Sequence, residues 1–253
     1  MNADPLRRLL YERAAARYDR YAEGHRSIAE ALAQFAASHL PEGAMCLDVA
    51  AGAGAVAHAA SICKNARFIC ADASLAMCRR NAFPSVACDM VALPFRNGAF
   101  DVAYCSMALH WAQDATQALR EMRRVAPFAA IAVPVEGSLS RLHDAIANAS
   151  PNLRVFSFPR VDGLLDAAQE AGWKVRAHNV ALRPVTFLSA ADALRHVRGW
   201  GGNNPAGDKK TPYVGRGALL RLQEAFDKAD AAQETWRVLY AALQKTGGKE
   251  KIA

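Results

Sequence analysis

Three aspartates stand where a ligand-binding carboxylate would be useful, each at or near the end of a short apolar run. Asp48 lies in the first run, Asp72 closes the second run 24 positions later, and Asp89 follows the third. Because the carboxyl ends of parallel strands share one edge of a sheet, the three acids would face one crevice. A carboxylate there can accept two hydrogen bonds from ribose hydroxyls. The spacing predicts an adenosine site, although loop caps and turn residues remain an alternative.

A turn of small residues follows the first aspartate and favours the same kind of ligand. The turn reads Ala-Ala-Gly-Ala-Gly over residues 50–54. Small side chains let a ligand lie against the backbone, and the following helix offers free N–H groups at its start. A nicotinamide dinucleotide would call for a further glycine after Gly54 in the G-x-G-x-x-G pattern, and the chain lacks it. A mononucleotide-like ligand therefore fits the turn better than a dinucleotide.

Short apolar runs alternate with helical patterns over residues 44–133. Strands are predicted at 44–49, 67–71, 85–88, 100–105 and 129–133, and helices at 55–63, 74–81 and 114–125. This alternation specifies a doubly wound α/β fold with a mostly parallel sheet. The elements bring the ends of the first three strands, and with them the three acids, to one edge.

The flanking segments follow a different rhythm and suggest four parts of the chain. Residues 5–39 read as helical in two pieces separated by Gly24. Beyond residue 135, helices are predicted at 138–149, 161–171, 190–197 and 217–230, strands at 173–182 and 235–243, and a loop at 199–217. We therefore expect a helical lid over 1–40, a cofactor-binding core over 41–135, sheet completion and a substrate lobe over 136–244, and a disordered tail over 245–253.

The composition excludes several classes of protein. With 253 residues and 52% apolar side chains, the chain can bury a sizeable core. Its net charge of +7 comes from dispersed basic residues, which disfavours nucleic acid as a partner. The sequence shows neither a signal peptide nor an apolar stretch long enough to span a membrane. Its six cysteines form no CxxC pair and no metal-ligand spacing, so we expect free thiols, no metal and a cytoplasmic location.

On these residues the chain resembles the class I S-adenosylmethionine-dependent methyltransferases. Their first turn usually reads D-x-G-x-G-x-G, and here Ala50 replaces the first glycine. The resemblance implies a seven-stranded Rossmann-like sheet with an N-terminal helical lid and a C-terminal helical insertion, and S-adenosyl-L-methionine as the cofactor. The implied cofactor-binding residues are Asp48, Ala50, Gly52, Asp72, Ala73, Met77, Asp89, Met90, Ser106 and His110.

Five further pieces are similar to one group, the malonyl-(acyl-carrier protein) O-methyltransferases of biotin synthesis. They lie at 13–26, 106–111, 136–143, 197–204 and 234–236. The resemblance implies esterification of the free carboxylate of a malonyl thioester on an acidic acyl carrier protein. Tyr18, Arg198 and His143 are then the candidates for orienting that carboxylate, and Arg141 departs from the group's pattern, which has an acid there.

The implied chemistry requires few side chains. A carboxylate is already an anion at neutral pH, so methyl transfer to it requires positioning and no general base, and the fork of an arginine matches a carboxylate. Seven basic residues against two acids between positions 176 and 216 would attract an acidic carrier protein. Two alternatives remain open, namely a methyltransferase for a small-molecule acid or phenol and a non-catalytic binding protein of the same fold. The oligomeric state does not follow from the sequence.

Overall fold

The apolar runs pair into one mixed sheet in the computed structural model, which describes residues 9, 12, 15, 18, 22–39, 41–149, 157–199 and 216–246. The strands are β1 (Met45–Val49), β2 (Arg67–Asp72), β3 (Ser85–Ala87), β4 (Val102–Ser106), β5 (Phe128–Pro134), β6 (Trp173–Thr186) and β7 (Gln233–Lys245). They lie in the order β3-β2-β1-β4-β5-β7-β6. The first five are parallel, and β7 runs antiparallel to both β5 and β6. The seven-stranded, doubly wound fold predicted from the sequence is confirmed.

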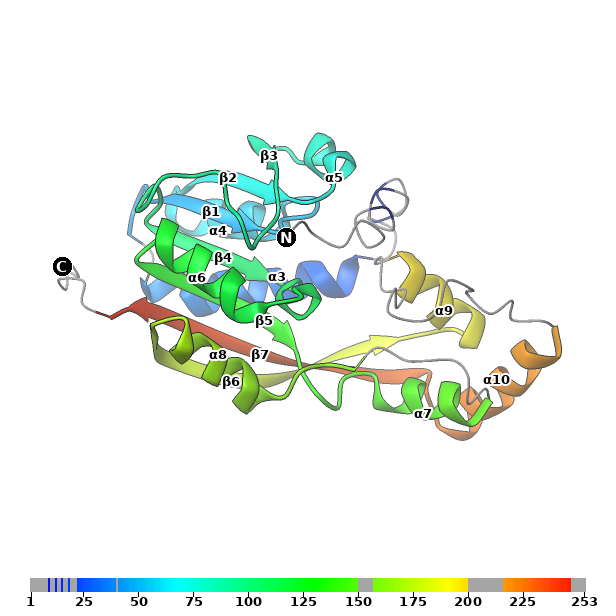
Figure 1. Ribbon diagram of the computed structural model, residues 1–253. Helices are drawn as coiled ribbons and strands as arrows, with labels where there is room; N and C mark the ends of the chain where they lie inside the picture. The colour runs from blue at the N-terminus through cyan, green and yellow to red at the C-terminus, as the bar shows by residue number, and fades with distance from the viewer. Residues whose placement is uncertain are drawn as a thin grey trace.

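Helices cover both faces of the sheet because successive strand residues point to opposite sides. Cys46 belongs to one buried core and its neighbour Leu47 to the other. The first core contains α3 (Glu23–Ala36) and α4 (Ala55–Lys64), and the second contains η3 (Leu109–Trp111), α6 (Ala115–Val125) and α8 (Val161–Glu170). In Figure 1, α6 and α8 lie in front of the sheet and α3 lies behind it. Two smaller elements are η2 (Ala37–His39) and α5 (Leu75–Arg80), of which α5 contacts β2 and β3.

A helical lobe extends the molecule beyond the carboxyl edge of the parallel strands. It consists of α7 (Ser140–Ala149), α9 (Ala190–Gly199) and α10 (Arg216–Lys228), which the long strands β6 and β7 reach (Figure 1). In α7 the buried side chains Leu142, Ala145, Ile146 and Ala149 follow helical spacing, and the helix packs against α10. The lobe corresponds to the helical insertion expected after residue 135.

The boundaries of several elements differ from those predicted, for physical reasons. Gly24 does not separate two helices, because α3 begins at Glu23 and continues through it. β6 continues past Pro184 to Thr186, which is possible because β6 is an edge strand of the sheet. β7 continues to Lys245, whose N–H donates to Pro127 O at 2.9 Å, while residues 247–253 lie outside the described part.

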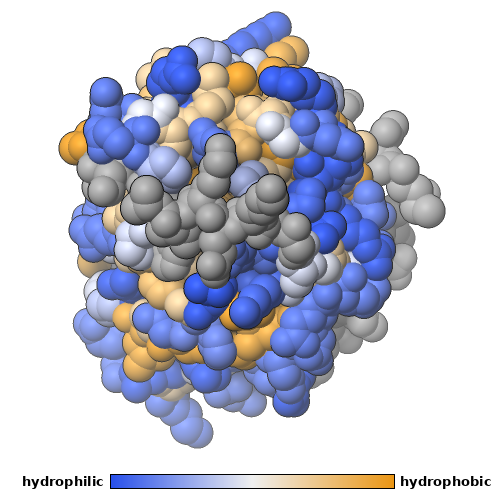
Figure 2. Space-filling model, turned by 90° about the vertical axis from the view of Figure 1, so that its left-hand side faces the viewer, coloured by the Kyte–Doolittle hydropathy of each residue, from blue (hydrophilic) through white to orange (hydrophobic). Residues whose placement is uncertain are grey.

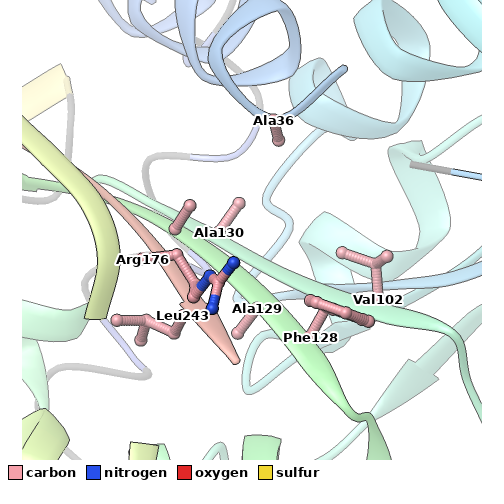
Figure 3. Close-up of a pocket in the computed structure, with 8 residues that line it drawn as sticks. Ala36, Val102, Phe128, Ala129, Ala130, Arg176 and Leu243 are labelled. Carbon is pink, nitrogen blue, oxygen red and sulfur yellow. The ribbon is translucent and has the colours of Figure 1, made fainter. Parts of the chain in front are cut away.

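The opposite edge, where the parallel strands begin, is shown in Figure 2 as hydrophilic side chains around apolar areas. A small pocket on this edge is lined mainly by alanines and by Val102, Phe128 and Leu243, with the Arg176 side chain lying across it (Figure 3). It lies at the far end of the strands from the three aspartates. Among the described helices, none has the length and apolar character needed to cross a bilayer.

Candidate functional site

Asp72, the last residue of β2, joins two turns at the carboxyl edge of the sheet. Its Oδ2 accepts a hydrogen bond from Gly52 N–H at 2.8 Å, and its Oδ1 accepts one from Ser74 N–H at 2.8 Å. Burial raises the pKa of the Asp72 carboxyl, an effect that the two N–H donors oppose and that the nearby Glu12 increases. Asp72 therefore holds the small-residue turn in a fixed position beside β2.

The small-residue turn over residues 50–54 is in the left-handed conformation at three of its positions. The φ angles are 55° at Ala50, 53° at Gly52 and 82° at Gly54. A Cβ on Gly54 would lie 2.6 Å from Oδ1 of Asn81, whose Nδ2 donates to Gly52 O at 3.3 Å. Glycine adopts this conformation readily, whereas alanine does so at a cost of roughly 1–2 kcal/mol. Ala50 is therefore strained at the position where the resemblance expects glycine.

Asp48 lies beneath the turn, one residue before the end of β1. Its side chain is buried, and its Oδ2 accepts a hydrogen bond from Ala57 N–H, near the start of α4, at 3.3 Å. Burial raises the pKa of the carboxyl to about 7. Asp48 thus fixes the start of α4 under the turn, and its direct contact with a ligand stays a prediction.

Two predicted residues present buried oxygen atoms that have no hydrogen-bond partner among the described residues. They are Oδ2 of Asp89, in the turn after β3, and Oγ of Ser106, the last residue of β4. The other carboxylate oxygen of Asp89 accepts a hydrogen bond from Val91 N–H at 3.2 Å. Buried polar atoms without partners are uncommon and often mark the place of a ligand or water. Both atoms lie at the carboxyl edge of the sheet, Asp89 after β3 and Ser106 at the end of β4, with β2 and β1 between these two strands.

The remaining cofactor candidates lie in the turns and helix around the aspartates. Ala73 is half-buried in the turn after β2, and Met77 is fully buried in α5. Met90 is half-buried and packs against the second core. The Met77 N–H donates to Oγ of Ser74, the N-cap of α5, at 3.2 Å. These residues shape the edge, and their contact with a ligand stays a prediction.

The loop after Asp89 is held by Arg124 and Glu121 of α6, which we call the α6 clamp. Arg124 donates from Nη2 to Leu93 O at 2.8 Å and from Nη1 to Phe95 O at 2.5 Å. Glu121 accepts the Leu93 N–H at 2.8 Å, and the two side chains pair through two bonds of 2.7 Å. The hydrogen bond from Arg124 holds the pKa of Glu121 below its usual value. The clamp thereby positions the loop that follows Asp89, one of the residues predicted to bind adenosine.

Rings from the N-terminal segment and from β7 meet beside the small-residue turn. The ring centroids of Tyr18 and His25 are 6.2 Å apart, and those of His25 and Trp236 are also 6.2 Å apart. A Cβ on Gly52 would lie 3.6 Å from the Tyr18 hydroxyl oxygen, so Tyr18 reaches the turn itself. Burial lowers the pKa of His25 to about 4, which leaves its ring neutral at pH 7.

Phe158 connects this group to two of the predicted site residues. Its ring centroid lies 5.7 Å from that of Trp236 and 5.8 Å from those of His110 and His143, and it stacks on His143 with 7° between the planes. Burial lowers the pKa of His143, against a smaller opposite effect of Asp144. We call Phe158, His110, His143 and Trp236 the ring wall.

The structure therefore gathers most of the predicted site residues at one edge. Tyr18 contacts the turn, and His110 and His143 belong to the ring wall. Arg198 lies in α9, but its side chain falls outside the described part of the chain. The roles of Tyr18, His143 and Arg198 in orienting a carboxylate stay predictions.

Several residues at this edge were not predicted as site residues. Phe158, Trp236 and the α6 clamp have no spacing pattern that marks them, because they come from separate elements that only the fold brings together. Glu12 is a similar case, since its Oε2 accepts the Ala76 N–H of α5 at 3.1 Å across 64 positions of sequence. For Trp236 the resemblance of residues 234–236 to one enzyme group was the available signal.

Known proteins resemble the chain at the levels of sequence and fold. The sequence family described as "Methyltransferase domain" matches residues 47–127. A malonyl-(acyl-carrier protein) O-methyltransferase of Pseudescherichia vulneris is 32% identical over 227 residues, which are 85% of this chain and 87% of the relative. A structure assigned as a methyltransferase from Bacillus halodurans C-125 has a TM-score of 0.61 at 16% identity, covering 86% of this chain and 98% of that chain. The geranyl diphosphate C-methyltransferase of Streptomyces coelicolor A3(2), solved with S-adenosyl-L-homocysteine, has a TM-score of 0.52 at 15% identity over 85% and 79% of the two chains.

Proposed function

Because the chain belongs to the methyltransferase family that includes the malonyl-(acyl-carrier protein) O-methyltransferases, we propose that it methylates the free carboxylate of a malonyl group on an acyl carrier protein. The chain is an S-adenosylmethionine-dependent methyltransferase. The observation that carries the finer proposal is the 32% identity to the P. vulneris enzyme over most of both chains. The proposed reaction belongs to the early part of biotin synthesis.

The carboxyl edge of the sheet fits S-adenosylmethionine, which supplies an activated methyl group when bound. Asp72 at the end of β2 would accept hydrogen bonds from ribose hydroxyls through the lone pairs that its bonds to Gly52 and Ser74 leave free, as acids at this position do in related folds. The buried Oδ2 of Asp89, which has no partner among the described residues, can accept one from an adenine amine. The α6 clamp holds the loop after Asp89 in place for that contact.

The protein's contribution to the proposed reaction is to hold the malonyl carboxylate in line with the methyl group. Positioning of this kind can contribute roughly 7–11 kcal/mol, and the carboxylate needs no general base at neutral pH. The Tyr18 hydroxyl, beside the turn, can donate to one carboxylate oxygen, and Arg198 of α9 would supply the cation. The lowered pKa values of His25 and His143 leave their rings uncharged at pH 7, so they line the site as neutral groups.

The charge of the chain supports an acidic carrier protein as the partner. The net charge is +7, and Arg176, Arg183 and Arg195 belong to the basic region between residues 176 and 216. Complementary charge speeds the encounter of such partners and fixes their orientation. The proposal also places the protein in the cytoplasm, where free thiols such as those of Cys46 and Cys105 stay reduced.

A methyl-transfer assay tests this proposal. The protein is incubated with methyl-labelled S-adenosylmethionine and malonyl-(acyl-carrier protein), with free malonate and a panel of small acids and phenols in parallel reactions. We expect a labelled, base-labile ester on the carrier protein, and lower turnover in Tyr18→Phe and Arg198→Ala than in Arg120→Ala, whose side chain pairs with Glu170 away from the edge. Label on a small acid or phenol and none on the carrier would overturn the proposed substrate.

A further inference from the structure

We infer that Phe158 limits the length of the acyl group that the site accepts, by filling the space into which a longer chain would have to bend. The inference rests on the proposed function, because it concerns the acyl group of that substrate. It makes Phe158 a specificity-determining residue, which neither the sequence motifs nor the comparisons single out.

The backbone places the Phe158 ring at the carboxyl edge of the sheet. The next residue, Pro159, accepts a hydrogen bond through its carbonyl oxygen at 2.9 Å from the N–H of Glu136, which lies two residues after the end of β5. Arg160 is then the N-cap residue of α8. Phe158 is therefore held between the end of a central strand and the start of a helix, and it does not depend on side-chain contacts alone for its position.

The Phe158 ring fills the space between three elements that surround the predicted crevice. Its neighbours are His110 of η3, His143 of α7 and Trp236 of β7, with centroid separations of 5.7–5.8 Å. His110 follows β4, whose last residue Ser106 presents the buried hydroxyl described above. Residue 158 as a whole is half-buried. Removal of the ring would open space at the centre of the wall.

The chemistry of the ring wall suits methylene groups better than charges. Phe158 is an apolar ring, and the ring of Trp236 is apolar apart from its N–H group. Burial favours the neutral form of His143. A malonyl group has one methylene between its carboxylate and its thioester. A longer dicarboxylic acyl group must fit extra methylenes between the methyl donor and the mouth of the site. Apolar pockets discriminate one methylene by roughly 10-fold to 200-fold in kcat/KM.

The test compares kcat/KM for malonyl-, succinyl- and glutaryl-(acyl-carrier protein) across four forms of the full chain. These are the wild type, Phe158→Ala, Phe158→Leu and Phe128→Ala. Phe128 is a half-buried phenylalanine at the start of β5, beside the pocket on the opposite edge, and serves as the matched control. A ratio of two substrates on one preparation is unaffected by a loss of folded enzyme, so a merely structural effect does not move it.

We expect Phe158→Ala to raise the succinyl-to-malonyl ratio of kcat/KM by about 10-fold or more, Phe158→Leu to raise it less, and Phe128→Ala to leave it unchanged. An unchanged ratio in both Phe158 variants, with malonyl methylation intact in the wild type, would overturn the inference and leave the proposed function standing. A wild-type chain that methylates none of the three acyl carriers would overturn both.

Discussion

Replacing Ala50 by glycine should stabilise this protein, although the same replacement destabilises most proteins. The φ angle of Ala50 is 55°, in the left-handed region. An L-residue in this region costs roughly 1–2 kcal/mol, and glycine adopts it without that penalty. Against this gain, glycine loses about 0.5–1 kcal/mol more conformational entropy on folding than alanine. The difference predicts a net increase of about 0.5–1 kcal/mol in the free energy of unfolding for Ala50→Gly.

The assay is thermal and urea unfolding of the purified chain, with Ala59→Gly as the matched control. Ala59 lies inside α4, within ten residues of Ala50, where the backbone is helical. Glycine in a helix interior costs about 1 kcal/mol relative to alanine. For a chain of this size, 1 kcal/mol corresponds to a change of about 2–4 °C in Tm. We expect Ala50→Gly to raise Tm by about 1–4 °C and Ala59→Gly to lower it by about 2–4 °C.

The two variants must move Tm in opposite directions if the reasoning is right. If Ala50→Gly lowers Tm as Ala59→Gly does, the conformation of residue 50 cannot be left-handed in solution, and the strain argument fails. Repeating the urea series with saturating S-adenosylmethionine adds a second readout, because a ligand that binds only the folded state raises its stability by an amount that grows with the logarithm of the free ligand concentration divided by Kd. A larger increment in Ala50→Gly than in the wild type would show that the Ala50 methyl group also hinders the cofactor.

Three further predictions follow from single contacts. Arg124→Lys should weaken S-adenosylmethionine binding about 10-fold, measured by calorimetry. The reason is that the substitution removes hydrogen bonds from a charged group to the loop after Asp89, and such bonds contribute about 1.5–3 kcal/mol. The control, Arg120→Lys at an exposed position of the same helix, should change the affinity by less than about 2-fold. Asp48→Asn should become more stable relative to the wild type as pH rises from about 4 to 7. The folded pKa of about 7 lies above the unfolded value near 3.9, so over that range the unfolded wild type releases the proton while the folded wild type retains it, and the wild type alone loses stability as pH rises. A difference in unfolding free energy that is flat with pH would contradict this. Ser138→Ala should lower the unfolding free energy by about 1–3 kcal/mol in urea, because the buried hydroxyl accepts the Arg237 N–H and donates to a backbone carbonyl, while Ser61→Ala should lie within about 0.5 kcal/mol of the wild type.

The strands could be predicted from the sequence because buried parallel strands read as continuous apolar runs. The runs at 44–49 and 129–133 match β1 and β5 closely, since both strands have helices on both faces. β6 was predicted to end at residue 182, shortly before Pro184. The strand continues through Pro184 because an edge strand tolerates proline, and its position at the edge is a property of the assembled sheet that local pattern does not contain.

The aspartates could be predicted as a group, but the part each plays could not. Spacing placed Asp48, Asp72 and Asp89 at strand ends, where the structure has them. The structure separates them by their partners. Asp48 accepts a helix N–H and Asp72 accepts two turn N–H groups, whereas Asp89 has one buried oxygen with no partner among the described residues. These partners depend on how the turns fold over the acids, which residue type and spacing do not encode.

The ring wall shows why the site as a whole exceeds what the sequence can predict. Its members lie at positions 110, 143, 158 and 236, and β7 brings the last of them back between β5 and β6. The return is pinned by backbone bonds from Val135 N–H to Arg237 O at 2.8 Å and from Leu139 N–H to Thr235 O at 2.9 Å. A shift of one residue in this antiparallel register would turn Trp236 to the other face of the strand.

Two pieces that resemble the malonyl-(acyl-carrier protein) O-methyltransferases, 136–143 and 234–236, gain a physical explanation from the same contacts. The buried Glu234 accepts the Leu142 N–H in the first turn of α7 and so caps the helix that carries His143. Ser138 binds the backbone of the strand that carries Trp236. The residues that carry the resemblance here are therefore mostly ones that position the ring wall. A relative that keeps them is expected to keep the shape of this wall, even where the residues facing the substrate differ.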